Sequence, residues 1–117
     1  MASPQEKILA NTCAVDRDFA TVVATFTGAE DDLIACIRAG LTAGGYTNLN
    51  FRGFILYNNT GQIITIYTKT GQSASGLTYP AAAMLPFWPF VESPGKGLFI
   101  LVAGGLGAST SRVACFY

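Results

Sequence analysis

The sequence is dominated by short runs of β-branched and aromatic residues, separated by stretches rich in Gly, Pro, Asn, Ser and Thr. The clearest run, 19–27, places small and apolar side chains on one face of an extended strand and threonines on the other. The apolar face consists of Ala20, Val22, Ala24 and Phe26. Similar runs occur at 54–57, 62–68, 98–103 and 112–117. Short strands between such turns predict an all-β fold, either a small antiparallel β-sandwich or a jelly-roll-like barrel.

The chain is expected to form a single domain. Its 117 residues fall in the usual range for one domain. A chain of this size buries roughly two thirds of its unfolded surface, so it needs no metal or disulfide to fold. Residues 1–12 are mostly polar and are interpreted as an N-terminal arm, which leaves 13–117 as the β-sandwich domain.

Two β-hairpins are predicted. The first joins 54–57 to 62–68 through a turn whose Asn and Gly residues tolerate the positive φ of tight hairpins. The second joins 98–103 to 112–117 through a loop rich in Gly and Ser. The apolar positions of the strands give the expected core, which comprises Val22, Phe26, Ile55, Ile64, Ile66, Ile100, Val102 and Val113.

The stretch near 30–43 can be read as a short helix or as a strand. Leu33, Ile34, Ile37 and Leu41 recur at helical spacing, and the two glycines at 44–45 would end a helix. Against a helix, Gly40 lies inside the stretch, and the sequence Ile-Ala-Cys-Ile suits a strand equally well. Both alternatives stay open from the sequence.

The charge and histidine content exclude several classes of function. Seven Lys and Arg residues balance seven Asp and Glu residues without forming a basic cluster, which argues against binding of a nucleic-acid backbone. The sequence has no histidine, which removes the Ser-His-Asp triad, the Cys-His pair and every imidazole base. Charged residues make up only 12%, a composition that favours association with neighbouring subunits.

Neither a membrane segment nor a disulfide framework is expected. The longest apolar runs, such as 98–103, are far shorter than the roughly 20 residues that cross a bilayer. The first residues carry charges where a secretion signal would need an apolar run. Cys13, Cys36 and Cys115 are odd in number and widely spaced, so they are predicted to be reduced, as in a cytosol.

The candidate chemical motifs have structural interpretations. The acidic groups at 16–18 and 30–32 lack the partners of a general acid–base pair and the spacing of a calcium loop, so they suit solvated turns or the end of an element. The Gly-rich stretch 104–111 lacks the Gly-Lys-Ser/Thr ending of a phosphate loop. We therefore expect no catalytic residue, no metal site and no cofactor.

The most unusual segment lies at 79–91, where aromatic residues alternate with prolines. Three readings stay open: a buried crossover that covers one end of the fold, a subunit interface, or a carbohydrate platform built on Trp88 and Tyr79. The candidate interface residues are Tyr79, Met84, Leu85, Phe87, Trp88 and Phe90.

Two segments resemble small β-sandwich virion proteins of tailed bacteriophages. The first is FRGFILYNNTGQIIT at 51–65, in which Arg-Gly precedes a strand and a Gly-bearing turn leads into the next one. The second is the C-terminal pattern, in which the run 98–103 is followed by a Gly/Ala/Ser/Thr loop and by RVACFY. The resemblance covers 51–117 and implies a structural role in capsid decoration or cementing, at a vertex or in a spike. It brings no catalytic residues with it.

The expected function is therefore that of a noncatalytic structural virion protein, made in the host cytoplasm and acting through repeated subunit contacts. Its expected partners are other copies of itself and major capsid or other virion proteins. The alternative is a lectin-like β-sandwich module that binds carbohydrate, with a glycan as its ligand.

Overall fold

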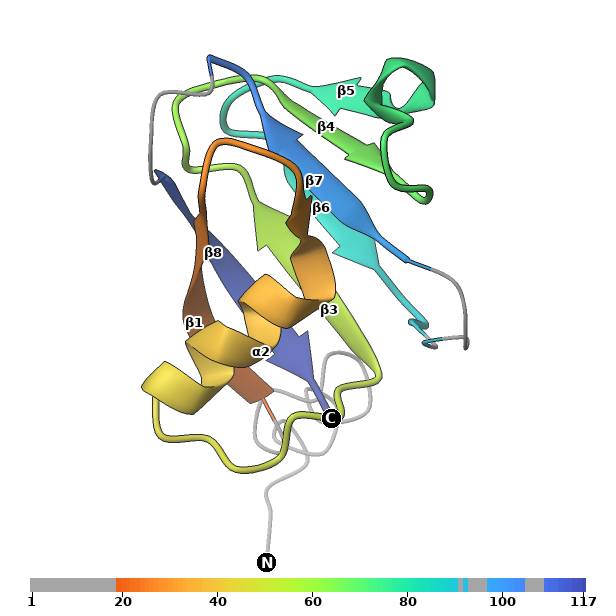
Figure 1. Cartoon of the computed structure of the whole chain (residues 1–117). Helices are drawn as coiled ribbons and strands as arrows, with labels where there is room; N and C mark the ends of the chain where they lie inside the picture. The colour runs from red at the N-terminus through yellow and green to blue at the C-terminus, as the bar shows by residue number, and fades with distance from the viewer. Residues whose placement is uncertain (1–18, 91, 93–96, 105–108) are drawn as a thin grey trace, which may run out of the picture.

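The computed structural model describes residues 19–90, 92, 97–104 and 109–117, and these form two four-stranded antiparallel sheets packed as a sandwich (Figure 1). The first sheet has the order β1 (Phe19–Phe26), β8 (Ser109–Phe116), β3 (Gly53–Tyr57), β6 (Met84–Phe87). The second has the order β2 (Asp31–Asp32), β7 (Phe99–Val102), β4 (Ile64–Tyr67), β5 (Leu77–Tyr79). The predicted sandwich is confirmed. The expected arm, 1–12, lies outside the described residues.

The core lies between the inner faces of the two sheets. Along β1 the predicted alternation is confirmed, because the residues at 20, 22, 24 and 26 are buried while those at 21, 23 and 25 are exposed. Seven of the residues expected in the core are buried: Val22, Phe26, Ile64, Ile66, Ile100, Val102 and Val113.

The eighth expected core residue, Ile55, was wrongly assigned. Its neighbours Phe54 and Leu56 are fully buried, and Ile55 points to the outer face of the first sheet, where it is half-buried. Side chains of a strand alternate between faces. Because β3 is apolar on both faces, the sequence pattern did not distinguish the inner residues from the outer ones.

Both predicted hairpins are wrong. Strand β3 pairs with β6 and β8 in the first sheet, whereas β4 pairs with β5 and β7 in the second. Strands β7 and β8 are likewise in different sheets, and β8 begins at Ser109, within the stretch expected to be a loop. Each of these connections crosses between the layers, because burying apolar faces against each other stabilises a sandwich more than a two-stranded ribbon does.

The crossing from β3 to β4 is held by a buried asparagine. Asn58 is 1% exposed, and its side-chain Nδ2 donates to the carbonyl oxygens of Gln62 at 2.8 Å and Pro80 at 2.9 Å. Its Oδ1 accepts from the Thr60 hydroxyl at 2.6 Å and from the Thr60 backbone N–H at 3.3 Å. One side chain thus joins the β3–β4 connection to the β5–β6 connection.

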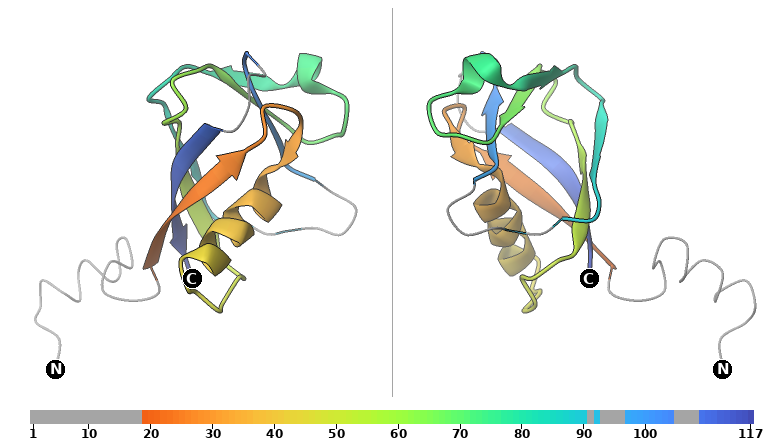
Figure 2. Two further views of the ribbon diagram at one scale, coloured as in Figure 1. Left: turned by 60° about the vertical axis from the view of Figure 1, so that its left-hand side comes forward. Right: turned by 90° about the vertical axis from the view of Figure 1, so that its right-hand side faces the viewer.

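The stretch near 30–43 forms a helix, α2 (Leu33–Ala43). Asp32 caps it, because one carboxylate oxygen accepts from the backbone N–H groups of Ile34 at 3.1 Å and Ala35 at 3.2 Å. The apolar residues predicted at helical spacing are all buried. Figure 2 shows α2 running alongside β1, and it also contacts β2 and β7, so it closes one lateral side of the sandwich.

The close approach of α2 to β1 requires a glycine. A Cβ atom at Gly40 would lie 2.3 Å from the carbonyl oxygen of Val23. The glycine that argued against a helix in the sequence is therefore the residue that lets the helix pack on the strand.

Candidate functional site

The structure divides the candidate interface segment between the core and the surface. Leu85 is 4% exposed and belongs to the core. Tyr79, Phe87 and Phe90 are partly buried and pack against that core. Met84 and Trp88 are 65% and 61% exposed. Of the six candidates, these two are therefore the ones that offer a large apolar surface to a partner.

A cluster of phenylalanines anchors this segment. The ring of Phe54 stacks on Phe87 with centroids 4.6 Å apart and meets Phe90 edge-on at 5.4 Å. Phe51 contacts both Phe54 and Phe90. The backbone N–H of Phe90 donates to the carbonyl of Arg52 at 2.7 Å. The residues on either side of Trp88 are thus fixed to the core.

The Trp88 ring packs over a glycine of the first sheet. A Cβ atom at Gly53 would lie 2.1 Å from Cε3 of the Trp88 ring, so any other residue at this position would displace the indole. The Trp88 ring also meets Phe116 edge-on at 6.1 Å. The sheet therefore holds an exposed aromatic ring in a defined position.

Trp88 is part of the outer face of the first sheet, whose β3 and β6 side is apolar and was not identified from the sequence. Strand alternation and register place Ile55, Tyr57, Met84, Pro86 and Trp88 on the β3 and β6 side of this face. The β1 and β8 side carries Thr21, Val23, Thr25, Thr110, Arg112, Ala114 and Phe116. Arg112 is the one charged member of this set, and it lies opposite both Val23 and Tyr57. The alternation in β1, which assigned 23 to the outer face, was the signal that could have revealed this face.

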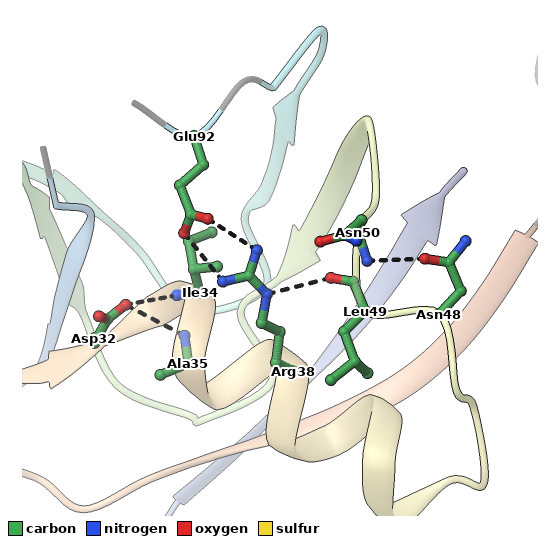
Figure 3. A network of polar contacts seen from close by, with 8 residues as sticks. All are labelled: Asp32, Ile34, Ala35, Arg38, Asn48, Leu49, Asn50 and Glu92. Atoms are coloured by element: carbon green, nitrogen blue, oxygen red, sulfur yellow. Dashed lines mark hydrogen bonds and ion pairs between the residues drawn. The ribbon is translucent and has the colours of Figure 1, made fainter. Parts of the chain in front are cut away.

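Arg38 on α2 binds two residues outside the helix, Leu49 and Glu92 (Figure 3). The guanidinium of Arg38 donates to both carboxylate oxygens of Glu92, at 3.0 and 3.1 Å, and its Nε donates to the carbonyl of Leu49 at 3.2 Å. The Arg38 hydrogen bond lowers the pKa of Glu92. The same guanidinium lies 5.9 Å from the ring centroid of Phe51. These contacts attach α2 to Leu49 and Glu92, so Arg38 has a structural role.

The acidic group at 30–32 also has structural partners. Asp31 accepts from the backbone N–H and the hydroxyl of Thr27, both at 3.0 Å. Glu30 accepts from the Tyr67 hydroxyl at 2.6 Å and from the Gly71 N–H at 2.9 Å, and these bonds lower its pKa. Burial, and then the Glu30 carboxylate, raise the pKa of Tyr67. Glu30 thus joins the start of β2 to the end of β4.

Two hollows border the sheets. A groove of ≈ 420 Å³ runs between β1 and α2, and its helix side consists mainly of small residues. A second hollow, of ≈ 500 Å³, includes Leu77 and Tyr79 of β5 together with Phe87 of β6. Within the described ranges, no group of three or more His, Cys, Asp and Glu side chains is arranged to hold a metal ion.

The described cysteines are free and buried to different degrees. Cys115 is fully buried and Cys36 is partly buried, whereas Cys13 lies outside the described residues. Burial raises the pKa of the Cys115 thiol to about 12. Burial, with smaller contributions from Asp31 and Asp32, raises that of Cys36 to about 11. At neutral pH both are thiols and not reactive thiolates.

We therefore expect slow labelling of Cys36 and Cys115 in the folded protein and complete labelling after unfolding. At pH 8 a thiol reagent should modify Cys115 only through opening of the fold, because the side chain is inaccessible. In denaturant without reductant, all three cysteines of the sequence should react. A count of one reactive thiol would show a disulfide and contradict the prediction of a reduced protein.

The helices of the described part of the chain include none with the length and apolar character needed to cross a bilayer. No protein-family model, no curated protein and no solved structure matches the chain. Its class is defined by architecture, as a small two-sheet antiparallel β-sandwich. Its most distinctive surface is the apolar β3 and β6 side of the outer sheet face, which carries an exposed tryptophan packed over Gly53.

Proposed function

We propose that this protein is a noncatalytic structural component of a virus particle that acts through repeated subunit contacts. The role is that of a capsid decoration or cement protein, a vertex protein or a spike component. The supporting observation is the outer face of the first sheet, where Trp88 and Met84 are more than half exposed. Exposed aromatic side chains on an apolar face are typical of protein interfaces.

The resemblance of 51–117 to small phage β-sandwich proteins supports the same role. The outer face belongs to that region except for β1, because β3, β6 and β8 all lie between 53 and 116. Weak contacts repeated over many copies give a stable assembly, since each contact makes the next one effectively intramolecular. A domain with one such face therefore needs no catalytic group to function in a particle.

A carbohydrate-binding role is the second candidate, and the exposed, flat Trp88 ring is the observation that favours it. Sugar recognition also needs polar groups placed to fix the hydroxyls of the ligand. The described side chains that the register and ring contacts place beside Trp88 are Pro86 and Phe116. This apolar surrounding favours a protein partner, and a glycan array tests the alternative directly.

Replacing Trp88 by alanine should weaken assembly without unfolding the domain. Large aromatic residues at interfaces typically contribute about 2 kcal/mol or more, and Trp88 is 61% exposed in the single chain. Sedimentation velocity should show weaker self-association, and the far-UV circular dichroism spectrum should stay unchanged. If Trp88→Ala unfolds the monomer instead, the segment is a cover of the core and not an interface.

The direct test of the function uses purified particles from the source of the protein. Particles made with and without the chain should differ in their integrity under heat or dilution, and the chain should be present in many copies by mass spectrometry. If the chain is absent from purified particles, or if its source has no virus or prophage, the virion role fails. The carbohydrate-binding role then becomes the leading candidate.

A further inference from the structure

The two lateral sides of the sandwich are closed to different degrees. On one side α2 contacts β1, β2 and β7, and so it covers the gap between the two sheets. The opposite side is bounded by the edge strands β5 and β6. The hollow of ≈ 500 Å³ lies here, between strands of both sheets, and we call it the β5 hollow. The inner space of the sandwich is therefore accessible from this side.

Side chains of the inner sheet faces line the β5 hollow. Leu77 lies opposite Ile66, which is buried in the core, so Leu77 belongs to the inner face of the second sheet. Phe87 lies opposite the fully buried Phe54 and lines the hollow from the first sheet. Leu77 is nevertheless 67% exposed. An inner-face leucine with this exposure offers apolar surface to a molecule that enters the hollow.

Polar side chains also line the β5 hollow, and one of them is charged. These residues are Thr68, Lys69, Gln72 and Ser75. Lys69 is the one charged residue among the described residues of the lining, and it makes no ion pair within the described part of the chain. An unpaired ammonium group beside apolar walls favours a ligand with an anionic group, to which the amide and hydroxyl neighbours can also donate.

The loop that carries Lys69 is held in place by backbone contacts. The Glu30 carboxylate accepts from the N–H of Gly71 at 2.9 Å. Gly76 brings the following turn against β4, because a Cβ atom there would lie 2.8 Å from the carbonyl oxygen of Ile66. The β5 hollow therefore exists before a ligand binds, as is usual for small-molecule sites.

The size of the β5 hollow indicates a small ligand. Its volume lies within the range of about 300–1,000 Å³ that is typical of small-molecule pockets. A stable protein partner would cover about 800 Å² on each side, far more than the lining of one hollow. The groove between β1 and α2 differs in charge, because three carboxylates line it, and it therefore disfavours an anion.

We propose that the β5 hollow binds a small amphipathic carboxylate. The apolar chain of the ligand lies against Leu77 and Phe87, and its carboxylate lies at Lys69. The hollow opens between the sheets, whereas Trp88 lies on the outer face of the first sheet. The inference therefore goes beyond the proposed assembly function and does not depend on it.

Titration with decanoate, at concentrations below those that form micelles, tests the proposal on the unchanged full chain. Calorimetry should show one decanoate per chain. Backbone amide NMR signals should shift at 66–69, 75–79 and 87, and signals of α2 should not. Decanol, which has the same chain length and no charge, should bind about 5-fold more weakly than decanoate, the upper range for an exposed ion pair.

Two variants with matched controls locate the two ends of the ligand. Lys69→Gln should weaken decanoate binding about 5-fold and leave decanol binding unchanged, whereas Arg112→Gln removes an exposed cation of the outer face and should change neither. Leu77→Ser should weaken both ligands about 10-fold. Its control is Ile63→Ser, because Ile63 is 53% exposed and lies outside the hollow.

Four results would overturn the proposal. Absence of decanoate binding up to about 5 mM would show that the hollow takes no such ligand. Equal binding of decanoate and decanol to the unchanged protein would remove the preference for an anion. Equal effects of Lys69→Gln and Arg112→Gln would remove Lys69 as its partner, and a Leu77→Ser variant that binds like the wild type would place the chain elsewhere. None of these results bears on assembly, which uses another surface.

Discussion

Asn58→Asp should lower the free energy of unfolding by about 3–5 kcal/mol at pH 7, which is the cost of leaving a buried charge uncompensated. The amide nitrogen of Asn58 donates to the Gln62 and Pro80 carbonyls. A carboxylate has no proton to donate, so it would set a negative charge against two carbonyl oxygens in a site that is 1% exposed. The two donors from Thr60 would offset part of this cost.

The destabilisation should depend on pH in a defined direction. Burial and the facing carbonyls raise the pKa of the new carboxyl in the folded state above its unfolded value of about 3.9. The charge-related loss is therefore absent below about pH 4, where the protonated carboxyl still donates to one of the two carbonyls, and it appears as the pH rises through the folded-state pKa. Urea unfolding of both proteins between pH 3 and pH 8 measures the difference.

Asn59→Asp is the matched control, because it makes the same chemical change at an exposed neighbouring position. It should change the unfolding free energy by less than about 0.5 kcal/mol. Equal losses in the two variants, or a loss in Asn58→Asp that does not vary with pH, would contradict the role given to the buried amide.

Phe54→Ala should cost about 3–5 kcal/mol, the usual range for removing a buried phenylalanine. Phe54 is fully buried and contacts three other rings, those of Phe51, Phe87 and Phe90. Its loss removes the ring on which the segment around Trp88 is anchored. We therefore expect weaker self-association as well as lower stability, measured by urea unfolding and by sedimentation velocity under native conditions.

Trp88→Ala is the informative comparison for this second prediction. It deletes a larger ring, but one that is 61% exposed, so it should cost far less in unfolding free energy than Phe54→Ala. If the two substitutions are equally destabilising, Trp88 contributes to the core, and the outer face loses its principal candidate residue.

The sequence by itself determined the class of fold. Side-chain alternation in β1 identified the buried residues of that strand, because an exposed strand face tolerates the threonines at 21 and 25. The helical spacing of Leu33, Ile34, Ile37 and Leu41 identified one face of α2. It did not decide between helix and strand, because Gly40 is unfavourable in an isolated helix and its reason for being there is the contact with β1.

For the candidate interface, the sequence indicated the segment but not which of its side chains are exposed. The spacing of rings and prolines at 79–91 marked the region as unusual, but Leu85 lies in the core while Met84 beside it is exposed. Which side chain of such a segment turns inward depends on the ring cluster around Phe54, whose members come from two distant parts of the chain, 51–54 and 87–90. No local pattern contains that information.

The pairing of strands was decided by the tertiary structure alone. The turn at 58–61 has the composition of a hairpin, yet β3 and β4 lie in different sheets. Local turn preferences are weak compared with the burial of two apolar strand faces, and each of these strands already has two partners supplied by distant segments. The position of Ile55, the hydrogen bonds of Asn58 and the apolar outer face all follow from those long-range pairings.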